Sequence, residues 1–370
     1  MQQYSQAKAM LAITKGSLKS IFRSPSAVVF SFLFPLIFIL VFGFINGGSS
    51  GPVFKIAVAK NSDTMNALYD SLKASPNVRI RYYDSEEQLR SDLVKGRITG
   101  ILSIEKNKTD SIPPYLYSLS TTTASRDRYP QFLNYLQVLS GRLTTNYKRL
   151  PPYAILNSSA PVEVETVREY KTIDFILPGQ LGFSLLSAGV FGVAFMFFNL
   201  RSTLVLKRFF ATPIHRTNIV LGEALSRVLF QLITSIVILG IGHFFFGFTL
   251  VHGFITFLEL LVLSFLGLVV FMGFGFIVSG LATSDSAIPP LANLITLPQF
   301  LLAGTFFDIE VFPKWLQPIC NVLPLTHLNN AMRKVAFEGA HLNDCMKEIG
   351  ILGLWGVFAY FLAIKVFKWE

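Results

Sequence analysis

Six long runs of apolar residues constrain the fold of this chain more than any other feature of its sequence. They cover residues 27–46, 173–200, 219–246, 254–280, 288–303 and 349–367. A helix needs about 20 apolar residues to cross the hydrocarbon core of a bilayer, and only the run at 288–303, which opens with Pro289 and Pro290, falls clearly short. Charged residues make up 15% of the chain, against about a quarter in soluble proteins. The sequence therefore predicts an α-helical polytopic membrane protein with six transmembrane helices.

The composition changes between the first and second runs, over residues 47–172. A flexible Gly- and Ser-rich exit is followed by about 120 residues with the alternation of a soluble domain, enough for a small core of its own. Strands are expected at 54–59, 78–83 and 98–104, helices at 64–74, 86–95 and 129–147, and an extended return at 162–170. We therefore expect an α/β domain inserted between the first two spans.

Residues 1–26 precede the first run and carry a helical pattern of their own. Apolar side chains recur there at three-to-four spacing, while Lys8, Lys15 and Lys19 lie largely off that stripe. A basic amphipathic helix of this kind suits the headgroup region of a membrane. The run at 27–46 starts too late and is too long for a cleaved signal peptide, and it lacks a small-residue cleavage pattern. The expected order is an interfacial helix followed by an uncleaved first span.

Basic residues indicate which loops are cytoplasmic. Four precede the first run, four lie in the loop at 201–218, and two end the last run. The loop at 247–253 has no Lys or Arg, and residues 304–346 have three against four acidic residues. By the positive-inside rule both termini and the 201–218 loop are cytoplasmic, while residues 47–172 and a hairpin at 304–346 are extracytoplasmic. The chain has a net charge of +10, and much of its positive charge is thus expected at the cytoplasmic face of a plasma (inner) membrane, where anionic lipid is a better partner than nucleic acid.

The loop at 201–218 is too charged to lie inside a bilayer. A helix along the membrane surface would direct Phe209 toward lipid and Lys207, Arg208 and Arg216 toward a partner. The alternative is an ordinary basic loop that contacts only lipid headgroups.

Two stretches carry a resemblance to a known family. The first contains Arg208, Phe209, Thr212, Pro213 and, at the start of the next run, Glu223. The second combines a glycine–aromatic turn with prolines, a tryptophan and an arginine. Its candidate residues are Gly304, Phe307, Pro313, Trp315, Pro324, His327 and Arg333. In order and spacing these stretches resemble the cytoplasmic loop and the extracytoplasmic hairpin of ABC-2 type transporter permeases that carry a large extracytoplasmic domain between spans one and two.

The resemblance implies that transport and ATP hydrolysis are carried out by separate chains. In the family, a short coupling helix in the cytoplasmic loop presses into a groove on a cytoplasmic ABC ATPase subunit, and two permease subunits pair, either as a homodimer or with a related paralogue. The chain has no G-x-x-x-x-G-K-[ST] phosphate loop, so it is expected to be no enzyme, with ATP hydrolysed by a partner. No cofactor is expected.

Several positions depart from the family pattern. Asp308 stands where the family often has proline, and His327 where tyrosine is common. Leu204, Val205 and Lys207 stand where a Gly-Thr and an acidic residue are frequent.

Three further features invite a functional reading. Glu259 is an intramembrane acid near His252, which favours either a substrate- or proton-linked site or a satisfied interfacial cluster. Glu223 and Arg227 stand four residues apart, either as a helix-surface pair or as a hinge contact that changes partners. Both cysteines lie in or beside the hairpin.

Cys320 and Cys345 leave three alternatives open. An oxidising compartment makes a disulfide between them plausible. His341 and Cys345 could instead supply two metal ligands, or both cysteines could be free and buried.

The functional expectation is a transmembrane permease subunit of an ABC-2 type exporter. It would move an amphipathic, lipid-like or drug-like substrate out of the cytoplasm or inner leaflet. The alternative is a non-transporting membrane sensor whose extracytoplasmic domain binds a ligand.

Overall fold

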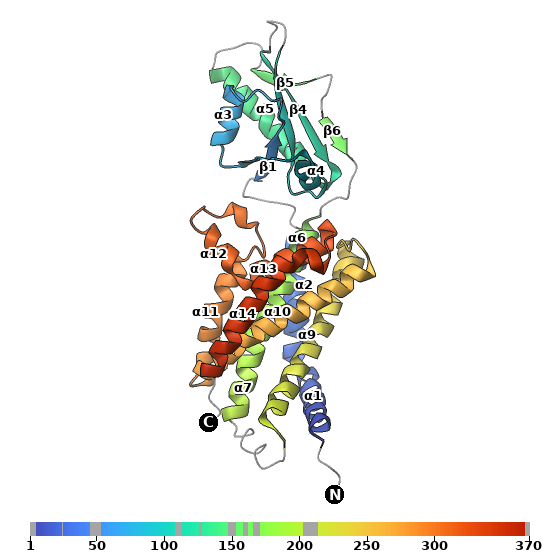
Figure 1. The fold of residues 1–370 in the computed structure, drawn as a ribbon, viewed down its shortest axis with the longest axis vertical. Coiled ribbons are helices and arrows are strands. Elements are labelled where there is room, and N and C mark those ends of the chain that lie inside the picture. The colour runs from blue at the N-terminus through green and yellow to red at the C-terminus, as the bar shows by residue number, and fades with distance from the viewer. Residues whose placement is uncertain are drawn as a thin grey trace. The chain divides into compact units, whose positions relative to one another are not determined.

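The computed structural model describes most of the chain, with gaps at several loops and at both ends. The described residues are 5–23, 25–44, 53–107, 113–125, 128–146, 153–157, 162–165, 171–202 and 214–366. They divide into two compact units (Figure 1). One, called here the helical unit, comprises Met1–Ile45 and Thr172–Glu370; the other, called here the α/β unit, is Asn46–Lys171.

The α/β unit is built on a six-stranded mixed sheet of order β2-β1-β3-β4-β5, with β6 also paired to β4. Pairing is parallel except between β3 and β4, which are antiparallel. The strands are β1 (Phe54–Val58), β2 (Val78–Arg81), β3 (Gly100–Lys106), β4 (Tyr115–Thr122), β5 (Ala154–Leu156) and β6 (Val162–Glu165).

Three helices accompany this sheet, α3 (Ala67–Ala74), α4 (Glu86–Val94) and α5 (Tyr129–Asn146). Side chains of β1, β3, α3 and α5 fill its main core, among them Ile56, Leu68, Leu102 and Phe132, none of which is exposed.

The sequence analysis did not predict two of the strands, β4 and β5. β4 carries a period-two signal, with Tyr117 and Leu119 buried and Ser118 and Ser120 between them, but its serines and threonines resemble a polar loop. β5 is only three residues long, too short to show a period.

The helical unit contains the apolar runs. Its helices before the 304–346 segment are α1 (Gln6–Phe22), α2 (Pro25–Phe44), α6 (Thr172–Ser187), α7 (Val193–Ser202), α9 (Arg216–Phe246), α10 (Phe254–Leu281) and α11 (Ile288–Leu302). A π-helical turn, η2 (Ala188–Gly192), joins α6 to α7 in one continuous helix, and a 3-10 turn, η3 (Asp285–Ala287), precedes α11.

Four helices of the described residues are long and apolar enough to cross a membrane. They are Thr172–Ser202, Thr217–Phe246, Phe254–Leu281 and Leu342–Val366. The remaining two predicted spans are shorter: the apolar part found in α2 is Ser31–Val41, and the 15 residues of α11 extend only about 22 Å. Four of the six expected spans are therefore supported, and the count of six stays a prediction.

The residues at 304–346 are folded mainly into short helices. They comprise η4 (Ile309–Val311), α12 (Gln317–Val322), α13 (Pro324–Arg333), a π-helical turn η5 (Lys334–Glu338) and η6 (Leu342–Cys345), which leads into α14 (Met346–Val366). Gly304 and Gly339 have φ of 68° and 73°, a left-handed conformation that glycine adopts without strain.

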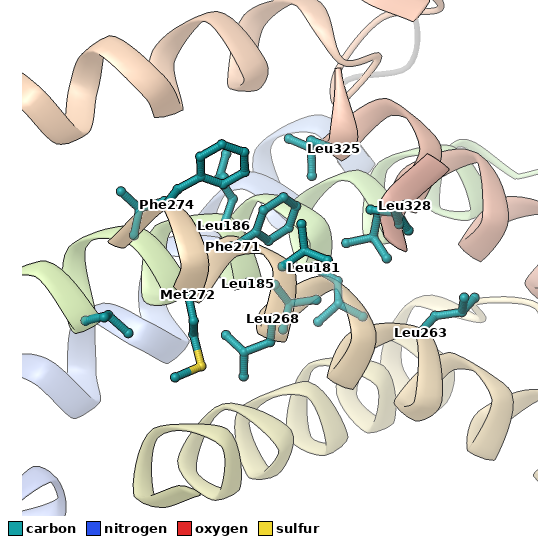
Figure 2. Close-up of a cluster of buried hydrophobic side chains, with 14 of the residues drawn as sticks. Leu181, Leu185, Leu186, Leu263, Leu268, Phe271, Met272, Phe274, Leu325 and Leu328 are labelled. Carbon is teal, nitrogen blue, oxygen red and sulfur yellow. The ribbon is translucent and has the colours of Figure 1, made fainter. Parts of the chain in front are cut away.

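The core of the helical unit lies where α6, α10 and α13 meet. Figure 2 shows leucines of α6 and α13 against the aromatic and leucine side chains of α10. Phe271, Leu185 and Leu328 are at its centre and have no exposed surface. This packing places the segment at 304–346 directly against the second and fourth predicted spans.

Candidate functional site

The proposed coupling residues fall largely in the undescribed loop between α7 and α9. Lys207, Arg208, Phe209, Thr212 and Pro213 lie outside the described residues. Arg216 is the first residue of α9 and Glu223 lies two turns further along that helix. The described residues on both sides of the loop show how its ends are held.

The end of α7, before the loop, is tied to the end of α10. Arg201 Nη2 donates a hydrogen bond of 2.9 Å to the carbonyl oxygen of Ala282. The same guanidinium lies 5.3 Å from the ring centroid of Phe198.

The start of α9, after the loop, is tied to α1. The side-chain oxygen of Gln6 accepts hydrogen bonds from His215 N and Asn218 Nδ2, both at 3.0 Å. Two turns on, Thr14 Oγ1 donates to the carbonyl oxygen of Gly222 at 2.9 Å. The amphipathic helix expected at the membrane surface thus also packs against a predicted span, along the turns that follow the loop.

Glu223 belongs to this contact as well. Its Oε1 accepts a hydrogen bond of 2.7 Å from Ser17 Oγ of α1. No ion pair joins Glu223 to Arg227 in the described structure. The two residues expected to pair from their spacing are therefore not in ion-pair contact, and Glu223 is hydrogen-bonded to a residue 206 positions away.

A substitution at Gly222 tests whether α1 is held in this way. A Cβ there would lie 2.9 Å from the carbonyl oxygen of Met10 and 3.2 Å from Ile13 Cβ, so Gly222→Ala should push α1 outward and destabilise the unit by about 1–3 kcal/mol. Gly240→Ala, on the same helix with nothing within 4 Å of the added Cβ, is the matched control. Thermal unfolding in detergent and proteolysis of α1 would measure the effect. Equal melting temperatures and protection for the two variants would contradict the packing.

Glu259 lies at the centre of a polar cluster. His341 Nδ1 donates to its Oε1 at 3.0 Å, and the backbone N–H of Leu342 approaches the same oxygen at 3.4 Å. The His341 ring stacks on that of His252 with centroids 4.7 Å apart. Of the two alternatives considered for Glu259, this geometry fits the interfacial cluster, although its Oε2 is buried without a hydrogen-bond partner.

Arg333 holds together the turn at Gly304 and the start of α6. Its Nε and Nη2 donate to the carbonyl oxygen of Phe175 at 3.2 and 3.0 Å, and Nη2 donates to that of Gly304 at 2.6 Å. The guanidinium also lies 3.6 Å from the centroid of the Phe175 ring. A single arginine therefore closes the 304–346 segment onto the second predicted span.

The other candidates of this segment have simpler surroundings. Pro324 is at the start of α13, where its missing N–H costs nothing. Pro313 accepts a hydrogen bond from Leu316 N, whereas Trp315 and Phe307 are 73% and 54% exposed.

His327, which stands where the family commonly has tyrosine, donates from Nε2 to the carbonyl oxygen of Asn321 at 2.8 Å. Burial lowers the pKa of its imidazole, and that hydrogen bond opposes the shift.

Both cysteines are free and buried. The structure therefore shows the third of the alternatives and not the disulfide between Cys320 and Cys345. Burial raises the pKa of the Cys320 thiol, which keeps it protonated and poorly reactive. Among the described residues no group of three metal-ligating side chains includes His341 and Cys345.

Sequence reasoning missed several buried polar residues of the helical unit. Asp174 Oδ1 accepts from Thr249 N at 2.8 Å, and Gln231 Nε2 donates to Ser184 Oγ at 3.0 Å. A signal was present, since Gln180 and Ser184 share one face of an otherwise apolar run.

The α/β unit has a groove of its own, of about 450 Å³. Tyr115 and Tyr153, whose rings stack with centroids 5.3 Å apart, form part of its wall. Asp70 and Lys106 add one charge of each sign.

Comparison with known protein families gives a match that extends over most of the chain. A model of the ABC-2 family transporter proteins matches residues 25–365. The chain belongs to this ABC-2 family. The resemblance inferred from the loop and the 304–346 segment is thereby confirmed, and the chain is a component of a multi-pass membrane transporter.

Individual relatives are distant. The chain is 24% identical over 369 residues to ABC transporter G family member 20 of Dictyostelium discoideum, covering 96% of this chain but only 50% of that protein. It is 22% identical to the linearmycin resistance permease protein LnrN of Bacillus subtilis, in an alignment that covers 96% of this chain and 97% of that protein. It is 19% identical to the probable multidrug ABC transporter permease YbhS of Escherichia coli, in an alignment that covers 87% of this chain and 86% of that protein.

Proposed function

We propose that this ABC-2 permease is the transmembrane subunit of an exporter driven by a separate cytoplasmic ABC ATPase. The observation that carries the proposal is the bracing of the 203–213 loop on both sides. Before the loop, Arg201 ties the end of α7 to the end of α10. After the loop, α1 is hydrogen-bonded to the first turns of α9. A loop fixed at both ends to the helix bundle passes a force applied to it into the helices, whereas a loop that merely contacts lipid needs no such bracing.

The proposed cycle follows from this arrangement. Closure of the ATPase subunits displaces the loop, which moves α7 together with α10 and α9 together with α1. A path at the interface with a second permease subunit, either a copy of this chain or a paralogue, then opens outward. In this topology both termini are cytoplasmic and residues 47–172 are extracytoplasmic.

The cargo proposed is amphipathic, lipid-like or drug-like. The helices expose large apolar side chains, and two relatives are named for resistance to linearmycin and for multidrug transport. Purification in mild detergent followed by mass spectrometry tests the proposal. We expect a stoichiometric protein that contains a phosphate-binding loop. Its absence after crosslinking, together with no ATP-dependent flux in vesicles, would refute the exporter and favour the sensor alternative, for which the groove at Tyr115 and Tyr153 is the ligand site to examine.

Charge reversal in the loop provides a narrower test. Lys207→Glu with Arg208→Glu should reduce ATP-driven transport about tenfold or more, the size of a typical coupling free energy. The partner's ATP hydrolysis and the permease's melting temperature should change little, because both charges belong to a loop that is expected at the membrane surface and not within a span. Lys314→Gln, an exposed basic residue of the 304–346 segment, is the control. Undiminished transport in the double variant would leave the loop as a contact for lipid headgroups alone.

A further inference from the structure

One face of α9 carries a line of polar residues deep into the helical unit. Glu223, Arg227, Gln231 and Ser235 follow one another at intervals of four and therefore lie one above the other. The line extends over about 18 Å, more than half of a hydrocarbon core of about 30 Å. Glu223, Gln231 and Ser235 are 8%, 1% and 0% exposed. Charged residues in such positions are rare, costly and usually functional.

Three members of this line form hydrogen bonds with other described residues. Glu223 accepts from Ser17 at 2.7 Å, Gln231 donates to Ser184 at 3.0 Å, and Ser235 donates to the Gln231 carbonyl oxygen at 2.9 Å. Arg227 differs. Its Nε is buried without a hydrogen-bond partner, and within the described residues no carboxylate forms an ion pair with its guanidinium.

The Arg227 guanidinium rests instead against Gly192, the last residue of the π-helical turn η2. A Cβ on Gly192 would lie 3.2 Å from Nη1 and 3.8 Å from Cζ of Arg227. Because glycine has no side chain, the space beside Gly192 is open, and the guanidinium occupies it. Single π turns within α-helices occur frequently at functional sites, and this one interrupts the helix that leads into the loop.

The contact joins the two helices on either side of the loop. Gly192 lies nine residues before Arg201 on the loop's entrance, and Arg227 lies eleven residues after Arg216 at its exit. Because no described residue forms a hydrogen bond with this guanidinium, none within the described structure has to break when α7 and α9 shift. The guanidinium can also pair with the Glu223 carboxylate one turn away, because a Glu four residues before an Arg on a helix is a favourable pair.

We propose that Arg227 is a positioning residue of the transport cycle, which passes displacement of the loop from α9 to the π turn at Gly192. Its guanidinium moves between Gly192 and the Glu223 carboxylate as the loop moves. Ser17 holds that carboxylate in the conformation described here. This inference rests on the proposed function and assigns a residue to its coupling step.

Two substitutions disturb the contact from opposite sides. Arg227→Gln removes the charge, and Gly192→Ala displaces only the far end of a flexible side chain, so it should be tolerated by the fold. Arg227→Lys keeps the charge. Gly240→Ala, which meets nothing within 4 Å on the same helix as Arg227, controls for the added methyl group. Each variant is reconstituted with the copurified ATPase, and ATP-driven movement of the dye Hoechst 33342, ATP hydrolysis and melting temperature are measured.

We expect Arg227→Gln and Gly192→Ala to lower dye movement about tenfold while hydrolysis stays within about twofold, which is a loss of coupling. Arg227→Lys should restore much of the movement, and Gly240→Ala should behave as the wild type. A parallel fall in movement, hydrolysis and melting temperature would show a structural role and overturn the inference, as would unchanged coupling. If the wild type itself moves no dye with ATP, the proposed function fails first; if it does and the variants match it, only the role of Arg227 fails.

Discussion

Replacing Arg333 with glutamine should destabilise the helical unit by about 3–5 kcal/mol. Hydrogen bonds to a charged group are each worth about 1.5–3 kcal/mol, and this guanidinium donates to the carbonyl oxygens of both Phe175 and Gly304. Its position over the Phe175 ring at 3.6 Å adds about 0.5–2 kcal/mol. The two carbonyls lose their partner together, so the turn at Gly304 should detach from α6. The measurement is thermal unfolding in detergent, where a fall of at least about 6 °C is expected.

Two companion variants make this result specific. Arg333→Lys retains the charge but not the geometry of the guanidinium, since an ammonium cannot reach both carbonyls in the same way. It should recover part of the stability. Lys314→Gln, an exposed change in the same segment, should leave the melting temperature within experimental scatter. A melting temperature for Arg333→Gln equal to that of Lys314→Gln would show that Arg333 is dispensable for closing the segment.

Among the glycines that the structure describes, Gly179 should be one of the least tolerant of an added methyl group. An added Cβ would overlap the backbone carbonyl oxygen of Thr305 and lie 3.0 Å from its Cα. Backbone atoms cannot rotate away, so α6 and the 304–346 segment must separate. Overpacking of this kind costs about 3 kcal/mol or more. The expected results are a low yield of monodisperse protein and loss of transport.

A graded series separates packing from helix propensity. Gly267→Ala would meet Leu328 Cδ2 at 2.5 Å, a side-chain end that can move, and Gly353→Ala would meet nothing within 4 Å. Alanine is favoured over glycine in helices by about 1 kcal/mol. Size-exclusion profiles should therefore rank Gly353→Ala at or above the wild type, Gly267→Ala below it and Gly179→Ala last. A different order would mean that α6 and the segment are not packed as described.

Much of the fold could be predicted because the signals are local. An uncharged run of apolar residues is costly to leave in water wherever it lies in the chain, so four of the spans follow from sequence alone. The strands β1, β2 and β3 likewise show their own apolar pattern. In β4 the alternation is obscured by serines and threonines, and β5 is too short to show one, so pairing with their neighbours identifies these two strands.

The location of the candidate site stays a prediction. The resemblance to the ABC-2 family was recognised in part from the glycine, prolines and arginine of the 304–346 segment, and the family comparison confirms the family. The pairing of Arg333 with two carbonyls, and the freedom of both cysteine thiols, depend on which segments become neighbours. The role of Lys207, Arg208 and their neighbours in coupling stays a prediction.

The sequence by itself determined that this chain is a multi-pass membrane protein of the ABC-2 family, because hydropathy and motif spacing are properties of contiguous residues. Only the tertiary structure decided the partners of its charged groups. Glu223 bonds to Ser17 rather than to Arg227, and Arg227 rests against Gly192. The physical reason is that a buried side chain contacts whichever groups folding brings near it, and for both residues these groups lie on another helix.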